Sequence, residues 1–198
     1  MKWNLELIRK EIAVMVPSSH SDGGEATMLI TVKGEKYLDR RSTGWILKRL
    51  AHFHNIDLSA VKKNYGPILG RKRFIPIPLS EKLIYVPLTL KTNTIPVDEK
   101  LGYISLVEVL GFERGSEHNN LILKNGIELF CCNTLKTIEA RYRESLLIQK
   151  IIQSEHSYEK YTKCPAGGSA SVAESNCDRE EIARFTAAFL YYWNSKRN

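Results

Sequence analysis

Short apolar runs separated by turn residues occupy the beginning of the chain. The runs at 11–16 and 27–32 are separated by a polar loop at 17–24, and this pattern predicts two strands joined by that loop. Gly34 offers a further turn, and a third strand is expected at 35–38. The sequence therefore predicts that the fold begins with strands.

A helical period follows these strands. Ser42 is a suitable N-cap for a helix at 45–53, whose apolar residues share one face while Lys48 lies on the other. A second, short helix is expected at 57–64, and Gly66 is expected to end it. These two helices are the first elements predicted after the strands.

The middle of the chain is rich in β-branched and aromatic residues. These residues predict strands at 74–78, 83–89, 101–109, 119–123 and 127–132. Asn125-Gly126 lies between the last two runs and is a strong hairpin signal. Prolines at positions 76, 78, 87 and 96 exclude long helices here and favour edge strands or extended segments.

From Leu135 the period becomes helical again and predicts a helix of about five turns that reaches Ile152. The expected fold class is α+β, with antiparallel strands around a basic helix and loop segment, followed by C-terminal helices. The expected organisation is a domain at 1–162, a flexible Gly- and Ser-containing linker at 163–177, and a C-terminal helix at 178–198. That last helix carries a stripe of Phe185, Phe189 and Trp193, which is typical of a core or subunit contact.

Composition limits the class of protein. Hydrophobic residues make up 43% and charged residues 26% of the 198 positions, close to the averages for soluble globular proteins. The longest stretch without a charged residue, 185–195, has eleven residues, whereas a membrane-spanning helix needs about 20. No secretory signal is visible near the N-terminus. We therefore expect a cytoplasmic protein with no membrane partner.

Positive charge is concentrated in one part of the chain. The whole sequence has 29 Lys and Arg against 22 Asp and Glu, a net charge of +7. Residues 33–73, here called the basic window, hold eleven basic and three acidic residues, a net charge of +8. Such an excess is typical of a surface that binds a polyanion, and the alternative is a solvated basic face without a partner.

Enzyme and metal signatures are absent from the sequence. There is no phosphate-binding loop, no nucleophile elbow and no His-Glu-x-x-His motif. The four cysteines and five histidines lack the close spacing of a structural zinc site, so we expect reduced thiols. The spacing of the carboxylates near predicted strands selects no magnesium site; these are Glu11, Glu25, Asp39 and Glu108. We therefore expect no catalysis, no metal and no cofactor.

The basic window contains a loose match to a helix-turn-helix. The apolar, small and turn positions of this motif would be occupied by Leu50, Ala51, Asn55, Ile56 and Val61. The second helix would then expose four side chains toward a major groove, namely Ser59, Lys62, Lys63 and Asn64.

A run of three cations follows this helix pair. Arg71, Lys72 and Arg73 stand directly after Gly70, on a predicted loop whose backbone can come close to a polyanion. Arginine in particular suits phosphates and narrow minor grooves. The loop therefore offers a second route to DNA binding.

The order of several motifs resembles the ComK family of competence transcription factors. These motifs are a Gly-x-x-x-Gly-Arg-Lys segment, a proline pair, an apolar strand with proline and threonine, and a Gly-aromatic-Ile-Ser segment, found here at 66–72, 76–78, 84–89 and 102–105. The Asn125-Gly126 hairpin and the following helix come in the family's order, and residues 12–17 resemble its N-terminal strand. The resemblance covers roughly residues 11 to 150.

The resemblance implies a transcription activator that recognises paired A/T-rich boxes, mainly through the minor groove, as a dimer or higher assembly. It also implies a proteolytic adaptor as a partner, whose recognition segment would lie after about Ser154, where no match to the family is found. Double-stranded DNA is the partner that the charge and the resemblance both favour. The residues expected to contact DNA are Lys48, Arg49, Lys62, Lys63, Asn64, Gly70, Arg71, Lys72 and Arg73.

Three alternatives remain at this point. The helix-turn-helix would bind the major groove instead of the minor groove. A nuclease of a mobile element would use the same basic face to deliver DNA to carboxylates. An interaction protein would present that face to an acidic partner.

Overall fold

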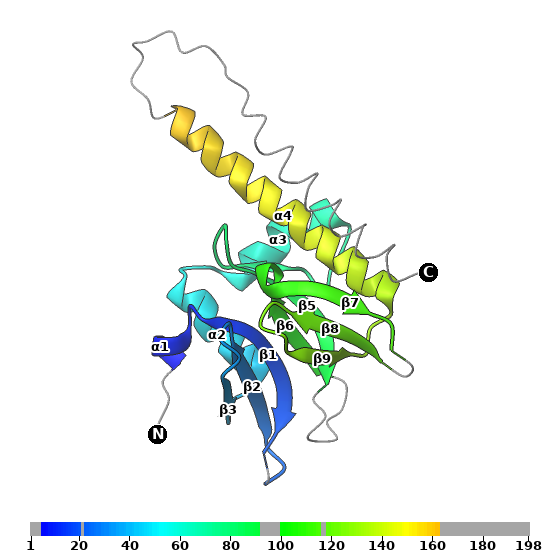
Figure 1. Ribbon diagram of the computed structural model, residues 1–198. Helices are drawn as coiled ribbons and strands as arrows, with labels where there is room; N and C mark the ends of the chain where they lie inside the picture. The colour runs from blue at the N-terminus through cyan, green and yellow to red at the C-terminus, as the bar shows by residue number, and fades with distance from the viewer. Residues whose placement is uncertain (1–4, 21, 92–99, 116–117, 163–198) are drawn as a thin grey trace. The chain divides into compact units, whose positions relative to one another are not determined.

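The computed structural model describes residues 5–20, 22–91, 100–115 and 118–162 (Figure 1). Its contacts divide the chain into two units, Met1–Glu159 and Lys160–Asn198, and the fold described below is that of the first unit. The expected linker at 163–177 and the C-terminal helix at 178–198, with its aromatic stripe, lie outside the described residues. The fold class is α+β, as predicted.

One antiparallel sheet forms the body of this unit. Its strand order is β3-β2-β1-β6-β5-β9-β8-β7, and β4 pairs with β5 beside this path. The strands are β1 (Ile12–Ser19), β2 (Glu25–Thr31), β3 (Lys36–Asp39), β4 (Ile77–Pro78), β5 (Ile84–Lys91), β6 (Lys100–Ser105), β7 (Val109–Glu113), β8 (Asn119–Leu123) and β9 (Glu128–Cys131).

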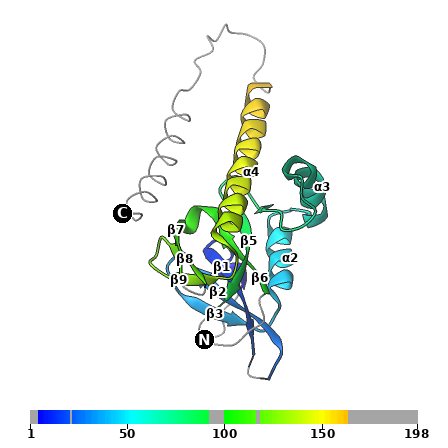
Figure 2. The ribbon, with the colours of Figure 1, turned by 90° about the vertical axis from the view of Figure 1, so that its right-hand side faces the viewer.

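Four α-helices and a short 3₁₀ helix accompany the sheet in the described residues. They are α1 (Leu5–Ile8), α2 (Thr43–Phe53), α3 (Leu58–Leu69), η1 (Leu106–Glu108) and α4 (Leu135–Thr162). Helices α2 and α3 follow one another on the same side of the sheet, and α4 crosses the sheet and extends past it (Figure 2). The basic window thus lies mainly on β3, α2, α3 and the loop after α3.

The hairpin predicted at Asn125-Gly126 is confirmed. Strands β8 and β9 pair in register on either side of it, and Gly126 has a φ of 80°, which favours glycine. The Asn125 side chain donates hydrogen bonds to the Thr31 and Val32 carbonyls at 3.2 and 3.4 Å. The hairpin turn is therefore held against the end of β2.

The prolines were expected in edge strands or extended segments; β5 is extended, but it is not an edge strand, since it lies between β6 and β9. Pro87 is tolerated because β5 pairs with β4 only up to Tyr85 and with β9 only from Leu90, which leaves a gap on that side. The Pro87 carbonyl accepts a hydrogen bond from Arg141 Nη1 at 2.7 Å, and the Thr89 N–H donates to Asn133 Oδ1 at 2.7 Å. Side chains thus complete this part of the ladder.

One cluster of the hydrophobic core lies between α2 and the sheet. Ile46 and Leu50 of α2 pack in one buried cluster with Met15, Leu29 and Tyr85 of the sheet. The Tyr85 hydroxyl donates to the Ile12 carbonyl at 2.9 Å, which satisfies its polar atom inside the core. Burial raises the pKa of this hydroxyl, so it stays protonated.

Helix α4 is longer than predicted, since it continues past Ile152 to Thr162. Its buried positions follow the helical period but include two polar residues; they are Ile138, Arg141, Ser145, Ile148 and Ile152. The Ser145 hydroxyl donates to the Arg141 carbonyl at 2.7 Å, within the helix. The buried face of α4 is therefore only partly apolar.

Candidate nucleic-acid interface

A tight turn joins α2 to α3. Ser42 caps α2 as predicted, since its hydroxyl accepts from the Trp45 N–H at 3.3 Å. At the other end Asn55 has a φ of 56°, and the next N–H, that of Ile56, donates to the Ala51 carbonyl at 2.9 Å. Asp57 then caps α3, because its Oδ1 accepts from the Ser59 N–H at 2.8 Å. The connection between the two helices is thus fixed at both ends.

Helix α3 does not end at Gly66, contrary to the prediction, but continues to Leu69. Gly66 is required there for a close approach, since a Cβ atom on it would lie 2.9 Å from the Arg71 carbonyl oxygen. Gly70 ends the helix with a φ of 62°, and the Arg71 N–H donates to the Gly66 carbonyl at 2.9 Å. This cap fixes the direction in which the cationic loop leaves the helix.

Most of α3 faces solvent. Val61 and Gly66 are its only buried residues, whereas Ser59, Lys62 and Lys63 are exposed. Asn64 is exposed too, but it lies on the stripe of α3 that lines a groove and not beside Ser59 and the lysines. The helix thus presents the two lysines on a face that the rest of the described chain leaves open.

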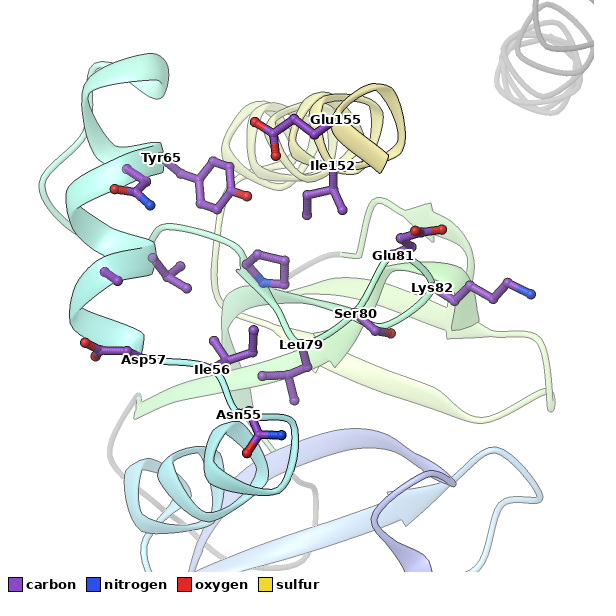
Figure 3. A pocket seen from close by; sticks show the side chains of 14 residues that line it. Asn55, Ile56, Asp57, Tyr65, Leu79, Ser80, Glu81, Lys82, Ile152 and Glu155 are labelled. Carbon is purple, nitrogen blue, oxygen red and sulfur yellow. The ribbon is translucent and has the colours of Figure 1, made fainter. Parts of the chain in front are cut away.

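That groove has a volume of about 670 Å³ and lies between α3, the turn at 78–82 and the outer part of α4 (Figure 3). Ile56, Leu79 and Ile152 contribute apolar walls, while Asp57 and Glu155 place carboxylates at its edges. Asn64 therefore faces a mixed apolar and acidic surface. Lys62 and Lys63 on the same helix face solvent instead.

The loop after α3 carries three consecutive cations that differ in their internal partners. Lys72 and Arg73 are exposed and form no salt bridge within the described residues. Arg71 is only partly exposed, and its Nε donates to Glu144 Oε1 at 2.6 Å. Phe74 follows with a φ of 57° and remains 40% exposed. Of the three consecutive cations, the last two are thus available to a ligand.

The arginines on the α2 side are engaged within the protein. Arg41 Nε donates to the buried Asp39 at 2.7 Å, which raises the pKa of Arg41, and its guanidinium lies 4.0 Å from the centroid of the Trp45 ring. Arg49 donates to Glu6 at 3.3 Å and stacks on the Phe53 ring at 4.6 Å. Lys48 is exposed and forms no salt bridge within the described chain. Of the two predicted contact residues of α2, Lys48 is thus available to a ligand, whereas Arg49 is held by Glu6.

Sequence reasoning missed two residues of α4 that hold this loop. Arg141 is only 5% exposed, and its guanidinium lies 4.4 Å from the centroid of the Phe74 ring. Burial lowers the pKa of Arg141, and the nearby Arg71 adds to this effect. Glu144, one turn later, binds Arg71. The only signal in the sequence was a charged residue at a position that the helical period of α4 assigns to the buried face.

The carboxylates considered for a magnesium site do not gather. Glu11, Glu25 and Asp39 each form a salt bridge with a different cation. No group of three or more His, Cys, Asp or Glu side chains in the described ranges could hold a metal ion. Within the same ranges, no helix has both the length and the apolar character needed to cross a membrane.

Comparison of the chain with protein-family models, with curated proteins and with solved structures found no match.

Proposed function

We propose that this protein is a cytoplasmic DNA-binding transcription regulator that acts without a cofactor or catalysis. In this proposal the loop after α3 contacts an A/T-rich minor groove. The observation that carries the proposal is the exposure of Lys72 and Arg73 on a loop that leaves α3 through a fixed cap, while Arg71 beside them is held in an internal ion pair.

The chemistry of the two grooves favours this loop. A narrow A/T-rich minor groove has an enhanced negative potential that attracts Arg and Lys side chains. Arg73 and Lys72 supply these cations, and Arg71 keeps the loop in place through Glu144. Lys62 and Lys63 on α3, with Lys48 and Arg49 on α2, add attraction to phosphates that does not depend on sequence.

Purified protein with labelled duplexes tests the proposal directly. We expect a retarded, intact band with an A/T-rich duplex and a weaker one with a G/C-rich duplex of the same length. Cleavage that requires Mg²⁺ would favour a nuclease instead, and the absence of any shift would favour a protein that binds an acidic partner.

Salt dependence tests the electrostatic part. The logarithm of the affinity should fall linearly with the logarithm of salt concentration, with a slope of about −0.9 for each phosphate contact. Roughly five contacts would weaken binding several-hundred-fold between about 50 and 200 mM salt. Affinity that barely responds to salt would contradict the proposal.

A second candidate is a helix-turn-helix that reads the major groove. It is favoured by the tight turn between α2 and α3, and by the exposure of Ser59, Lys62 and Lys63 on the second helix. In that case side chains of α3 would contact base edges, where a good bidentate pair discriminates by about 1–3 kcal/mol.

Competition and substitution separate the two candidates. Minor-groove binding predicts that netropsin displaces the protein, that Arg73→Ala weakens A/T-rich binding about tenfold, and that Asn64→Ala has little effect. Major-groove binding predicts the reverse, with loss of sequence preference in Ser59→Ala or Asn64→Ala and no displacement by netropsin. Arg73 is a cleaner test than Arg71, because Arg71 also holds an ion pair within the protein.

The proposed regulator acts as a homo-oligomer. The aromatic stripe that the sequence predicts at Phe185, Phe189 and Trp193 supports this, because such a stripe would be costly to leave in water. Truncation after Asn176 should lower the assembly state or the solubility, as measured by light scattering. A monomeric full-length protein that the truncation does not change would contradict the assembly.

A further inference from the structure

Helix α4 contacts the cationic loop on both sides of its two exposed cations. Before Lys72, the Arg71 side chain donates to Glu144 at 2.6 Å. After Arg73, the Phe74 ring lies over the Arg141 guanidinium at 4.4 Å. Arg141 and Glu144 are three residues apart on α4, so they are neighbours on one face of that helix. Two adjacent side chains therefore anchor both ends of a short loop.

The anchor at Arg141 is itself fixed to the sheet. Its Nη1 donates to the Pro87 carbonyl at 2.7 Å, in the gap of the β5 ladder, and the residue is only 5% exposed. A buried guanidinium in such a position has little freedom to move with the loop. The Phe74 ring thus rests on a rigid base.

The anchor at Glu144 depends on Arg71. The Glu144 side chain is 18% exposed, and its second oxygen, Oε2, is buried without a hydrogen-bond partner. A carboxylate in this setting needs nearby cations to compensate its loss of water; Arg141 interacts with it electrostatically, and Arg71 donates a hydrogen bond to it. The ion pair therefore opposes movement of Arg71 away from α4.

The backbone of the loop needs these anchors. Phe74 has a φ of 57°, a left-handed conformation that is unfavourable for an aromatic residue. The Arg71 N–H is held by the Gly66 carbonyl, but the described structure shows no such backbone bond for Lys72 or Arg73. The side-chain anchors thus supply the restraint that the backbone lacks.

We propose that Glu144 and Arg141 are positioning residues, which hold the loop at 71–74 in the conformation that presents Lys72 and Arg73 to DNA. The positioning stands on the structure alone, whereas its effect on DNA affinity rests on the proposed function. A loop ordered in advance binds more tightly, because less conformational freedom is lost on binding.

Limited proteolysis tests the positioning without DNA. Trypsin cleaves after Lys and Arg, so fragments ending at 71, 72 or 73, followed by mass spectrometry, report how often the loop opens. Glu144→Ala should accelerate their appearance at least fivefold. The matched control is Glu139→Ala, which removes the same charge from the same helix but breaks only an exposed pair with Arg143, and it should change the rate less than twofold.

Exchanging the charges of Arg71 and Glu144 distinguishes loss of their ion pair from a general loss of structure. Arg71→Glu combined with Glu144→Arg should restore protection at 72 and 73, because the ion pair re-forms with its charges reversed. Equal cleavage rates in Glu144→Ala and Glu139→Ala, with both proteins folded by circular dichroism, would overturn the positioning. Failure of the charge exchange to restore protection would also overturn it.

DNA affinity then tests the consequence. Both Glu→Ala variants remove a negative charge, which by itself favours DNA binding. Positioning predicts that Glu144→Ala nevertheless binds about three- to tenfold more weakly than Glu139→Ala. Equal or tighter binding would show that DNA does not use the anchored conformation. If the wild-type protein binds no duplex at all, the proposed function fails, while proteolysis still decides the positioning.

Discussion

Helices α2 and α3 follow one another in the chain and carry similar charge, yet they use it differently. On the α2 side, Arg41 and Arg49 are held by Asp39 and Glu6 and are stacked on aromatic rings. On α3 and the loop after it, Lys62, Lys63, Lys72 and Arg73 reach solvent without a salt bridge in the described chain. Charge density along a sequence therefore does not locate an interface. Lys48 of α2 is also unpaired, so the better guide is the group of unpaired cations that the fold brings together on α3 and the loop after it.

The largest effect is expected from the unpaired cations of the loop. Lys72→Ala with Arg73→Ala should weaken duplex binding about 60-fold at about 0.1 M salt, because two cations that neutralise the charge of DNA phosphates from the minor groove are lost, and should reduce the salt slope by about 1.8. Fluorescence anisotropy across a salt series measures both quantities. The matched control, Lys36→Ala with Arg40→Ala, removes two cations that are likewise exposed and form no salt bridge in the described chain but belong to β3 and the residue after it, and it should change affinity less than threefold. Equal losses of affinity in the two double variants would mean that DNA is attracted by the charge of the whole basic window and not by the loop in particular.

A paired arginine should behave in the opposite way. Arg41→Ala leaves the carboxylate of Asp39, which is 4% exposed, without its cation. We expect a loss of about 2 kcal/mol in the free energy of unfolding, or about 4–8 °C in melting temperature. DNA affinity measured well below the melting temperature should hardly change. A large loss of affinity with unchanged stability would place Arg41 in the interface.

The glycines of the two helices provide a third test. A Cβ atom added to Gly44 in α2 meets nothing within 4 Å, so Gly44→Ala should stabilise the protein by up to about 1 kcal/mol. A Cβ atom on Gly66 in α3 would meet the Arg71 carbonyl at 2.9 Å, so Gly66→Ala should destabilise it by about 1–2 kcal/mol. Chemical denaturation measures both values. Stabilisation by both substitutions would show that the loop need not approach α3 so closely.

The smallest effect concerns the two N-caps. Hydrogen bonds from Ser59 lower the pKa of Asp57 at the start of α3, whereas Ser42 at the start of α2 does not titrate. A depressed folded-state pKa stabilises the protein above the unfolded value, near 3.9, and this contribution is lost as pH falls through the folded value. Hydrogen exchange should therefore show α3 opening before α2 in acid. Asp57→Ser should abolish this difference, and persistence of the difference would assign it to another group.

Much of the fold could be predicted from local patterns. The Asn125-Gly126 hairpin and the Ser42 cap depend on residues close together in sequence, and both are confirmed. The end of α3 was misplaced because Gly66 serves a close approach and not a helix end. The interior position of Pro87 could not be predicted, because the gap in β5 is filled by residues about fifty positions later. Rules based on neighbouring residues fail where contacts with residues distant in sequence determine the local structure.

The candidate site shows the same limit more strongly. The sequence identified the run from Arg71 to Arg73 but could not show that the first of these cations binds Glu144, which lies 73 positions away. Nor could it show that Arg49 binds Glu6, which lies 43 positions earlier. Which of the nine predicted contact residues meet DNA stays a prediction that the experiments above address.

The gap in β5 also affects how the protein is made. During synthesis, β5 leaves the ribosome well before Asn133 and Arg141, which later satisfy the free side of Thr89 and Pro87. In that interval the nascent chain carries a hydrophobic strand with an open edge, the kind of surface that pairs with other chains. Pro87 lacks an N–H group and so interrupts any strand that would add there. Pro87, which is unusual at an interior position of the folded sheet, thus opposes aggregation of β5 before Asn133 and Arg141 are in place.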